Sequence, residues 1–531
     1  MPTDCITYQN SGYFTPLIVD YLEQKSNLKS LYNRFPNLEN FEAQILEKKE
    51  NFNDSTKRKK LVSVLESQYA KIDCSAATSK NIQLLGKSDT FTVTTGHQLN
   101  LFSGPLYFLY KIISTINLTK ELKSKYPNYN FVPIYWMATE DHDFEEINYF
   151  NFKGRKFRWD TASSGPVGRL STESLASFFE IFSSELGNGK NAEFLKKLFE
   201  KSYLNSSNLA DATRILTNEL FGEYGLVILD ADHPDLKRSF IPYIKEELTN
   251  TTLHKKVLET IEKLKKYPIQ VKPREINLFY ITTHLRERIL FEAGKYKVNN
   301  TTTEFSLTEI LELVEQHSEK FSPNVILRPL YQEVILPNLC YIGGGGEIAY
   351  WLELKSYFDA VNVTFPMLLV RNSVVLATEK QNKKADKLGL TWSNLFLKPT
   401  NLINYKIKQV SEIPMDLSDL KKQLHKQFET LIKITTQTDK SFLGAVKAQE
   451  AKQIKGLEKL EKRLLKAQKK KYASELERIT DLQNELFPNG SLQERQTNFS
   501  ELYLEYGATL LPQLIKELKP LENNFNIMVL Q

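Results

Sequence analysis

The sequence predicts an α/β protein built on a parallel sheet, followed by a long helical coiled coil. Two observations support this prediction. Strand patterns alternate with helix patterns over residues 91–384, as they do in chains of βαβ units. Over residues 385–490 the pattern changes to long, charged stretches in which leucines recur at heptad spacing.

The composition is typical of a globular protein with several domains. The chain has 531 residues, of which 41% are hydrophobic and 25% are charged. Its first residues lack the basic start and apolar run of a signal peptide, and no stretch approaches the ~18 apolar residues of a membrane span, so we expect a cytoplasmic protein. The three cysteines, Cys5, Cys74 and Cys340, are far apart, which predicts reduced thiols rather than disulfides or a zinc site.

The first βαβ unit follows a helical region at residues 1–88. The β-branched stretch "FTVTT" (91–95) leads directly into Gly96, and Pro105 then opens a helical pattern. A second strand, "FVPIYWMA" (131–138), ends in an acidic cluster. Because parallel strands end at the same edge of a sheet, we expect these two strand ends to lie together, at the edge where ligands bind.

The alternation resumes after an interruption. A hairpin-like stretch, "FNFKGRKFRW", and helical segments predict an insertion, and the strand "GLVILDADHP" follows it. Beyond strand-like "NLFYITTH" and "RERILFE", the chain reads as helix, strand, glycine turn and helix, and then a strand, "FPMLLVRNS". The resulting division has two halves of the core, an insertion between them, an antiparallel coiled coil, and a C-terminal segment packed back on the core: residues 1–148, 149–220, 221–384, 385–490 and 491–531.

The coiled coil carries much of the excess positive charge. In "KGLEKLEKRLLKAQKKKY" (455–472), apolar residues recur every three or four positions, so the lysines and arginines are interpreted as the solvated face of a helix. No interleaved aromatic residues accompany this charge, which disfavours nucleic-acid binding.

The first candidate site is the turn after the first strand, "TGHQLN". Gly96 and the helix that follows can present backbone N–H groups to a phosphate or carboxylate, and His97, Gln98 and Asn100 add polar groups. The alternative is an ordinary turn with a hydrogen-bonded histidine.

Two acidic clusters follow strands. In "EDHDFEE", the residues Asp141, His142 and Asp143 can bind a metal, orient an amine or act as general acid or base, and a solvated acidic loop is the alternative. In "LDADHP", the residues Asp230, Asp232 and His233 repeat this chemistry more weakly, and a helix cap before Pro234 is the favoured interpretation.

A glycine loop in "CYIGGGGEIAYW" (340–351) is the third kind of candidate. Consecutive glycines between a strand and a helix favour close approach of the backbone to a ligand, although no Lys-Ser/Thr follows and a P-loop is excluded. The loop starts with Gly343 and Gly344 and ends at Gly346, and Glu347 and Tyr350 follow within reach of the same pocket. Nearby cations suited to carboxylates are Arg328 and Arg371, for which surface or packing roles are the alternative.

Taken together, these motifs resemble a known family. "TGHQLNLFSGPLYFLYK", "PIYWMATEDHDFEEIN", "FSPNVILRPLYQEVILPNLCYIGGGGEIAYWLELK" and "SLQERQTNF" are similar, in order and over nearly the whole chain, to the cysteine-adding enzymes of bacillithiol biosynthesis, BshC. The resemblance implies a Rossmann-like core similar to class I aminoacyl-tRNA synthetases and nucleotidyltransferases, connective-peptide-like insertions, and a coiled coil that forms a homodimer. The implied reaction joins L-cysteine to the amine of glucosaminyl malate.

The resemblance also guides the assignment of residues. ATP or another nucleotide is the implied energy source, no metal is predicted, and Gln493, Glu494 and Arg495 of "SLQER" are candidate nucleotide contacts. The family pattern usually carries Gln in place of His97 and Pro in place of Gly345, which favours the turn itself, Gln98 and Asn100, over His97.

A mechanism consistent with both the residue patterns and the family resemblance activates the cysteine carboxylate as an acyl phosphate or adenylate. The glucosamine amine then attacks this activated carboxyl group. Asp141, His142 or Asp143 would act as base or orient the amine, and Arg328 and Arg371 would take the malate carboxylates. A metal-dependent hydrolase built on the two acidic clusters and a non-catalytic scaffold built on the coiled coil are the rival functions.

Overall fold

The computed structural model describes residues 4–530, which form two compact units. Unit 1 extends to Val375 and includes Gln493–Met528, and unit 2 contains Leu376–Leu492. Every residue discussed below as part of the pocket belongs to unit 1. The finer division into five segments stays a prediction.

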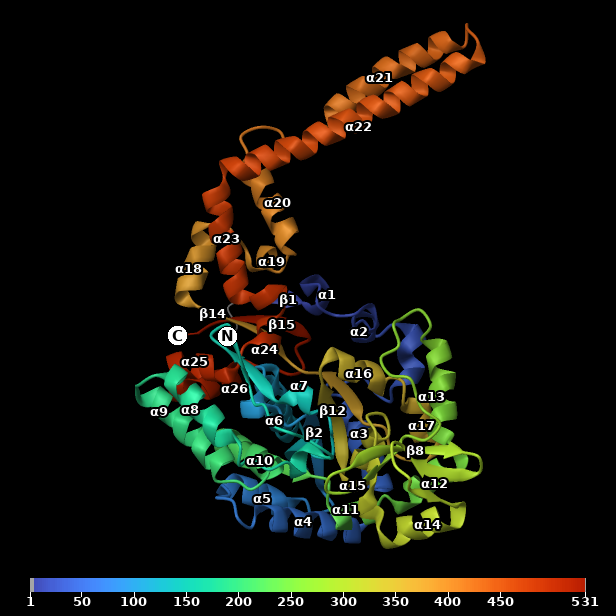
Figure 1. Cartoon of the computed structure of the whole chain (residues 1–531), viewed down its shortest axis with the longest axis vertical. Coiled ribbons are helices and arrows are strands. Elements are labelled where there is room, and N and C mark those ends of the chain that lie inside the picture. Colours follow the sequence, from blue (N-terminus) through green and yellow to red (C-terminus); the bar gives the residue numbers. More distant parts are fainter. Residues whose placement is uncertain (1–3, 531) are drawn as a thin grey trace. The chain divides into compact units, whose positions relative to one another are not determined.

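A five-stranded parallel sheet forms the centre of unit 1, which confirms the predicted fold class (Figure 1). Its spatial order is β13-β12-β2-β3-β6, and every neighbouring pair is parallel. The chain enters at the middle strand, moves outward to one side, and then returns to fill the other side. The order therefore reverses between β2 and β12, and in open α/β sheets ligands bind at such a switch point, outside the carboxyl ends of the strands. The strand bounds are β2 Thr90–His97, β3 Asn130–Met137, β6 Val227–Asp230, β12 Asn338–Gly343 and β13 Met367–Val370.

Apolar residues of the strands and of the flanking helices form the core. Strand β2 is buried along its whole length, as expected for a strand that is rich in β-branched residues and covered on both faces of the sheet. Helix α6 (Tyr107–Lys125) follows β2 and contributes Leu118 and Leu122 to a cluster that includes Phe91 and Val93 of the strand. The N-terminal helix α3 (Asn40–Asn51) adds Phe41 to the same cluster.

The N-terminal region is mostly helical, as predicted from residues 1–88. Its main helices are α2 Pro16–Leu22, α3, α4 Ser55–Tyr69 and α5 Ala76–Leu84. A short strand, β1 (Asp4–Thr7), precedes them and pairs antiparallel with β15 (Asn524–Leu530). The sequence pattern did not indicate this pairing, because each strand is short and its partner is far away along the chain.

The segment between β3 and β6 is a hairpin followed by helices, as predicted. Phenylalanine rings hold it against the turn after β2: Phe102 lies 5.4 Å, centroid to centroid, from both Phe182 and Phe199. The elements are β4 Tyr149–Phe152, β5 Arg155–Arg158, α8 Leu175–Leu186, α9 Lys190–Phe199 and α10 Leu209–Phe221.

A second, antiparallel sheet lies between β6 and β12 in the chain. The two strand-like segments recognised in the sequence are β7 (Leu278–Ile281) and β8 (Arg286–Glu292), but they belong to this sheet, ordered β10-β9-β8-β7-β11, and not to the core. Local patterns indicate strands without indicating their partners, so the second sheet was not predicted. Its other elements are β9 Lys295–Val298, β10 Glu304–Phe305, β11 Phe321–Pro323, α11 Pro234–Arg238, α12 Ile241–Asn250, α13 Thr252–Lys263 and α14 Leu307–Gln316.

The remaining helices of unit 1 flank the last two core strands and lead to the C-terminal strand. Helix α15 (Arg328–Ile335) precedes β12, and α16 (Gly345–Trp351) and α17 (Lys355–Ala360) follow it. After unit 2 the chain returns through α24 Gln493–Gln496, α25 Phe499–Tyr506 and α26 Leu510–Glu517.

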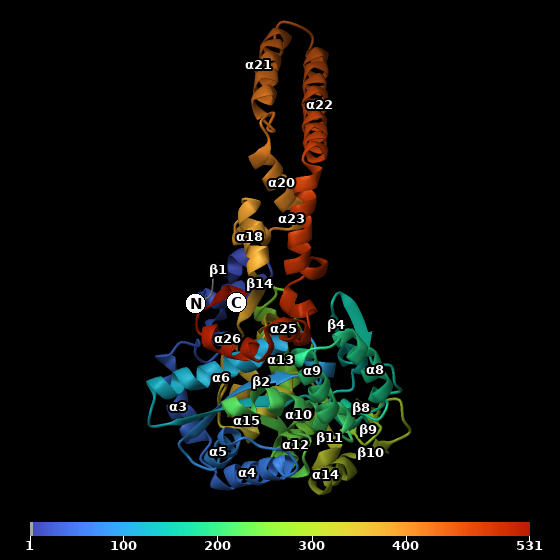
Figure 2. The same ribbon diagram turned by 90° about the vertical axis from the view of Figure 1, so that its left-hand side faces the viewer.

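Unit 2 contains the predicted antiparallel coiled-coil hairpin. Helices α21 (Ser418–Thr435) and α22 (Lys440–Lys471) lie side by side (Figures 1 and 2), and the Lys421–Glu461 ion pair (2.7 Å) fits an antiparallel register. The heptad-spaced apolar residues near the end of the predicted coiled coil, Leu476, Ile479, Leu482 and Leu486, lie outside the hairpin on α23 (Ala473–Leu486), which packs on α20 (Pro399–Val410) and α18 (Glu379–Lys387). Leu460, one of the apolar residues that recur every three or four positions in 455–472, is 54% exposed. No helix in residues 4–530 is long and apolar enough to cross a membrane.

Candidate active site

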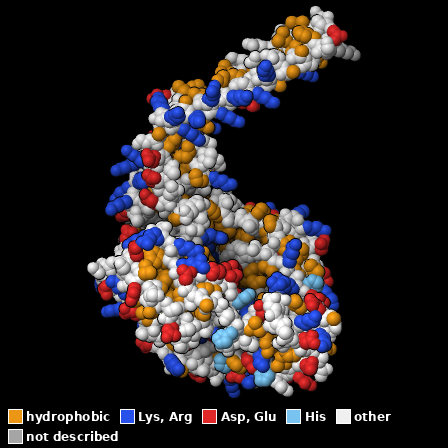
Figure 3. Space-filling model, in the orientation of Figure 1, with side chains coloured by type: hydrophobic (Ala, Val, Ile, Leu, Met, Phe, Trp, Pro, Cys, Tyr) orange, Lys and Arg blue, Asp and Glu red, His pale blue; other side chains and the backbone are white. Residues whose placement is uncertain are grey.

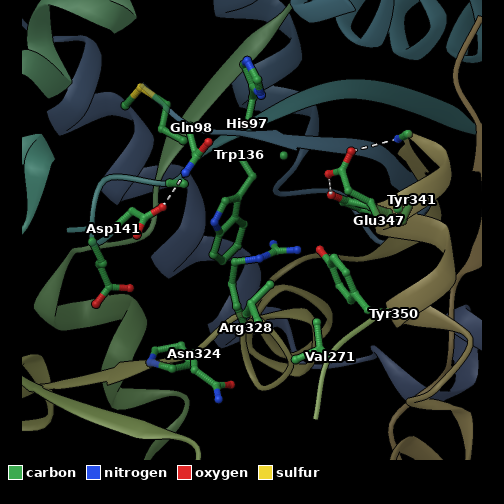
Figure 4. Close-up of a pocket in the computed structure, with 18 of the residues that line it drawn as sticks. His97, Gln98, Trp136, Asp141, Val271, Asn324, Arg328, Tyr341, Glu347 and Tyr350 are labelled. Carbon is green, nitrogen blue, oxygen red and sulfur yellow. Dashed lines mark hydrogen bonds between the residues drawn. The ribbon is translucent and has the colours of Figure 1, made fainter. Parts of the chain in front are cut away.

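A cavity of about 840 Å³ opens at the carboxyl edge of the core sheet, around the switch point. It is lined by the turn after β2, the turn after β3, and the start of α16, which follows β12. In Figure 4, Gln98 and Asp141 lie on one side, Tyr341 and Glu347 lie on the other, and Arg328 lies between them. The strand-end turns singled out in the sequence therefore meet at one pocket.

The pocket includes most, but not all, of the residues singled out in the sequence. Those that line it are Gly96, His97, Gln98, Asp141, His142, Arg328, Gly344, Glu347, Tyr350, Arg371 and Arg495. Those outside its lining are Asn100, Asp143, Gly343, Gln493 and Glu494.

Gln98 ties the turn after β2 to the turn after β3. Its Nε2 donates to Oδ2 of Asp141 (2.9 Å) and to Oε2 of Glu146 (2.8 Å). Asn100 donates to the backbone oxygen of Glu146 (3.3 Å) and shapes the turn from behind. The two polar residues of the turn thus position Asp141 and the backbone around it.

His97 is a buried, neutral imidazole. Its ring packs against Tyr107 and Phe108, at centroid distances of 5.3 and 5.1 Å, and its Nε2 has no hydrogen-bond partner within the described chain. Burial, together with the positive charges of Lys111 and Arg371, holds the pKa of His97 well below its usual range. A histidine that stays neutral can serve as a donor or acceptor at the pocket wall but not as a cation.

Asp141 is an ionised carboxylate held by donors. It accepts from the backbone N–H of His142 (2.8 Å), and Arg286 lies 3.9 Å away. Burial raises the pKa of Asp141, but hydrogen bonds from His142 and Gln98 and the charge of Arg286 outweigh it, and the pKa lies well below its usual range. Such a carboxylate is a weak proton acceptor and a good partner for an ammonium group.

His142 is oriented by Arg286. The Nη1 of Arg286 lies 2.8 Å from Nδ1 of His142, and because arginine can only donate, Nδ1 is the acceptor and the ring N–H is on Nε2. The guanidinium of Arg286 also stacks on the ring of Phe279, 4.0 Å from its centroid. Asp143, the third predicted catalytic residue, is exposed.

The acids that follow β3 and β6 are paired inside the protein. Lys237 lies 2.5 Å from Glu140 and 3.0 Å from Asp232, and Arg169 also binds Asp232 (2.6 Å). His233 caps α11 by accepting from the N–H of Asp235, which confirms the helix-cap interpretation of that motif. Across residues 4–530 we find no group of three His, Cys, Asp or Glu side chains arranged to hold a metal ion.

Glu347 and Lys111 join the glycine loop to the end of β2. Glu347 accepts from the N–H of Gly344 (2.8 Å) and from the hydroxyl of Tyr341 (2.7 Å), and it pairs with Lys111 (2.7 Å). Lys111 also donates to the backbone oxygen of Gly96 (2.5 Å). Burial raises the pKa of Glu347, but Lys111 and the hydrogen bonds outweigh this effect, so the pKa is lowered and the group is ionised.

The four glycines of the loop differ in what surrounds them. None has a positive φ. A Cβ at Gly343 would lie 3.0 Å from both Glu347 and Tyr341, so this glycine is required by the packing of the chain itself. Gly344, Gly345 and Gly346 line the pocket, and a Cβ at any of them would lie no closer than 3.5 Å to its neighbours, so the packing of the chain does not by itself require glycine there.

Arg371 is held by a residue from the C-terminal segment. Its Nη2 donates to Glu494 (2.7 Å) and its Nη1 to the backbone oxygen of Asn372 (2.8 Å), whereas Nε has no hydrogen-bond partner within residues 4–530. Glu494, predicted as a nucleotide contact, instead forms this buried ion pair with Arg371. The neighbouring Arg495 is exposed and lines the pocket.

The lining of the pocket is strongly positive. Seven Lys and Arg side chains line it against three carboxylates, and all three carboxylates have partners, as described above. Sequence reasoning missed four of the cations. They are Lys111, Lys272, Arg274 and Arg286. Lys111 lies in the first turns of α6, Lys272 and Arg274 lie between α13 and β7, and Arg286 begins β8, so no local pattern distinguishes these residues from surface residues.

The fold and the pocket define a Rossmann-like protein with a cationic pocket at the switch point of its sheet. Two family models match the chain: "Bacillithiol biosynthesis BshC, N-terminal Rossmann-like domain" over residues 1–372 and "Bacillithiol biosynthesis BshC, C-terminal coiled-coil domain" over residues 374–530. The chain belongs to the BshC family, which confirms the resemblance seen in the sequence.

Relatives match over essentially their full length. A Flavobacterium johnsoniae protein named "Putative cysteine ligase BshC" is 68% identical and covered over 100% of both chains. Proteins of the same name from Cytophaga hutchinsonii (36% identical, 99% of this chain and 98% of the relative) and Bacillus cereus (29%, 96% and 96%) are more distant. A solved structure titled "putative arginyl t-RNA synthetase" from Campylobacter jejuni covers 83% of this chain and 97% of its own at 10% identity, but its TM-score of 0.20 is too low to support any argument.

Proposed function

We propose that this protein is a cysteine ligase that forms an amide between the carboxyl group of L-cysteine and the amine of glucosaminyl malate. The names of its relatives support the ligase class. The observation that carries the substrate assignment is the charge of the pocket, because a lining with seven cations and three already paired carboxylates suits a ligand with several negative charges.

Arg328 and Arg371 are the proposed partners of the malate carboxylates. Both line the pocket near the switch point, and the Nε of Arg371 lacks a partner within the described chain. The guanidinium of Arg328 lies between the rings of Trp136 and Tyr341, at 5.5 and 5.7 Å from their centroids, which restricts its orientation. Guanidinium groups recognise carboxylates through paired N–H donors, so a restricted guanidinium also selects the direction of the ligand.

Asp141 is proposed to orient the attacking amine. Its low pKa keeps it charged, and it lies opposite Glu347 across the pocket (Figure 4). An ionised carboxylate attracts the ammonium form of the substrate. His142 lies beside it, but Arg286 donates to its Nδ1, which leaves this nitrogen unable to accept a proton from the substrate, so we assign His142 to orientation as well.

A nucleotide fits the remaining charges of the pocket. Lys272, Arg274 and Arg495 line it, are exposed, and have no carboxylate within ion-pair distance among residues 4–530. These residues would hold its phosphates, and the bound nucleotide would supply the activation that amide formation from a free carboxylate requires. ATP is the first candidate.

Homodimerisation through the coiled coil is part of the proposal. Apolar side chains remain exposed on the hairpin of α21 and α22, and Figure 3 shows hydrophobic patches among its lysines and arginines. The most exposed are Leu420, Leu431, Ile434, Phe442 and Leu460. A second copy could cover such a strip.

The decisive experiment is reconstitution. The full-length protein is incubated with glucosaminyl malate, L-cysteine and one nucleotide at a time, and the products are identified by mass. We expect the condensed amide with ATP or another nucleotide, and its absence with every nucleotide would contradict the proposal.

A pair of arginine variants links the reaction to the pocket. We expect Arg328→Gln to raise the KM for glucosaminyl malate by about tenfold or more, as for loss of a charged hydrogen bond. The matched control is Arg155→Gln, which changes an exposed arginine on β5 outside the pocket and should leave KM unchanged.

A further inference from the structure

A chain of buried polar side chains runs from Arg328 into the protein interior. The Nη1 of Arg328 donates to Oε1 of Gln332 (3.1 Å), one turn further along α15. The Nε2 of Gln332 donates to Oε1 of Glu333 (3.0 Å). Gln332 and Glu333 are almost completely buried, so neither is exchanging these contacts for water.

The partners of Gln332 dictate the orientation of its amide. A guanidinium can only donate, and Oε1 of Glu333 accepts here, as it does from Nδ2 of Asn338, so the amide oxygen of Gln332 faces Arg328 and the amide nitrogen faces Glu333. Turning the amide over would place donor against donor and acceptor against acceptor. Glu333 therefore fixes the orientation of the Gln332 amide, and the amide oxygen in turn fixes the position of Nη1 of Arg328.

Glu333 is itself fixed by two further contacts. Its Oε2 pairs with Nζ of Lys48 (3.0 Å), and its Oε1 also accepts from Nδ2 of Asn338 (2.7 Å), at the start of β12. Asn338 in turn accepts from the hydroxyl of Thr94 (2.9 Å) on β2. The network thus joins α3, α15 and the two strands that flank the switch point.

Lys48 is an unusual residue in this network. It lies on α3, 285 positions before Glu333, and its side chain is 2% exposed. A buried ion pair seldom adds net stability compared with apolar residues of the same size, because both charges lose their hydration. The geometry that the Lys48–Glu333 pair imposes on its neighbours therefore explains its presence better than stability does.

We infer that Lys48, Glu333 and Gln332 are positioning residues that set the guanidinium of Arg328 for recognition of a carboxylate of the substrate. The malate part of this inference rests on the proposed function, and the arrangement of the four side chains does not. The rings of Trp136 and Tyr341 lie 5.5 and 5.7 Å from the guanidinium carbon, the hydroxyl of Tyr350 accepts a hydrogen bond from the guanidinium, and Gln332 holds Nη1 from the interior side.

The test uses Gln332→Met in the full-length protein, with L-malate as the probe. Methionine has a similar length and removes both hydrogen bonds of the amide. We expect the dissociation constant for L-malate, measured by calorimetry, to rise about tenfold, because a hydrogen bond to a charged group is lost from the binding geometry. In the reconstituted reaction, KM for glucosaminyl malate should rise by a similar factor while kcat changes by less than about twofold.

Tyr331→Phe is the matched control. Tyr331 lies next to Gln332 on α15, is equally buried, and loses one side-chain hydrogen bond, to the backbone oxygen of Ala231 (2.8 Å), when its hydroxyl is removed. It has no contact with Arg328 in this network. We expect L-malate binding to remain within about twofold of the wild type, whereas a general effect of disturbing α15 would weaken binding in both variants.

A double variant separates positioning from mere stability. In the Arg328→Gln background, Gln332→Met should cause no further loss of L-malate binding, because residues that act through one another are not additive. Additive losses, or a Gln332→Met variant that binds L-malate like the wild type, would overturn the inference.

A crystal structure of the Gln332→Met variant keeps the inference independent of the substrate. We expect the guanidinium of Arg328 to turn away from the orientation that its hydrogen bond to Gln332 fixes, and an unchanged orientation would overturn the positioning role. If the wild type binds no L-malate, the substrate assignment of the proposed function fails, and this structure alone decides the positioning role.

Discussion

The two halves of the pocket use positive charge in different ways. In the inner half, at the switch point, Lys111, Arg328 and Arg371 each have a partner: Glu347, Gln332 and Glu494, respectively. In the outer half, Lys272, Arg274 and Arg495 are exposed and have no carboxylate partner within residues 4–530. The inner charges are held at defined positions, whereas the outer charges share a surface with solvent.

This difference indicates a division of labour. Buried, hydrogen-bonded cations are positioned before the ligand arrives and therefore select its geometry. Exposed cations contribute mainly a positive electrostatic potential, which raises the local concentration of an anionic ligand. This potential is screened by salt. The predictions below test this comparison.

The largest effect is expected from Arg371→Met in the inner half. The side chains of Arg371 and Glu494 are 5% and 1% exposed, so the variant leaves a buried carboxylate without its partner. We expect the free energy of unfolding, measured with urea, to fall by about 3–5 kcal/mol. Replacing Glu494 as well should restore part of the loss, and a loss below about 1 kcal/mol would mean that the pair behaves like a surface pair.

The next effect concerns the support of the outer half. Glu247 on α12 accepts from the N–H and the Nδ2 of Asn277 (both 2.8 Å), and Asn277 holds the backbone of Arg274. Burial raises the pKa of Glu247 from 4.5 to about 7, against the opposing effect of the Asn277 hydrogen bonds. The folded protein therefore holds a proton in this interval that the unfolded chain has released.

Stability should consequently fall as the pH rises from the unfolded to the folded pKa of Glu247. Over this pH interval the free energy of unfolding should fall by about 3 kcal/mol in total. Urea unfolding at about pH 5 and about pH 7.5 measures it, and Glu247→Gln should remove this part of the pH dependence. An unchanged slope in the variant would show that another group is responsible.

A third prediction concerns the carboxylate opposite the glycine loop. Asp141→Asn should lower kcat/KM for the reconstituted reaction by about 100-fold, as for loss of a positioned polar group at the reacting centre. The matched control is Asp143→Asn, which changes an exposed residue outside the pocket and should have less than a twofold effect. Equal losses in both variants would contradict the assignment of Asp141.

The smallest effect is expected from the outer cations. Lys272→Ala combined with Arg274→Ala should raise the KM for the nucleotide only several-fold at low salt, and the difference should shrink as KCl is added. An increase in KM that does not depend on salt would mean that these residues make fixed contacts, as the inner cations do.

The sequence predicted the edge of the sheet better than it predicted the pocket. The strand ends at Gly96, Asp141 and Gly344 followed from the alternation of strands and helices, since parallel strands must end together. The strand order could not be read in the same way, because a periodic pattern shows that a strand is buried and does not name its neighbour. The second sheet was missed for the same reason.

The missed pocket residues share one property: their partners are distant in the chain. Lys111 acts through Glu347, and Gln332 acts with Lys48 through Glu333, and no spacing in the sequence links these positions. The predicted catalytic triplet illustrates the opposite error. Asp141, His142 and Asp143 are adjacent, yet a turn directs neighbouring side chains differently, so Asp143 lies outside the pocket that Asp141 lines.

The pairing of Arg371 with Glu494 has a consequence for biosynthesis. During translation Arg371 emerges more than a hundred residues before Glu494, because the whole coiled-coil hairpin lies between them. A nascent chain that has completed the five core strands must therefore keep this arginine hydrated until the C-terminal segment arrives. The ion pair of Arg371 is accordingly among the last contacts of the pocket to form, and a fragment ending near residue 372 would lack the partner of this arginine.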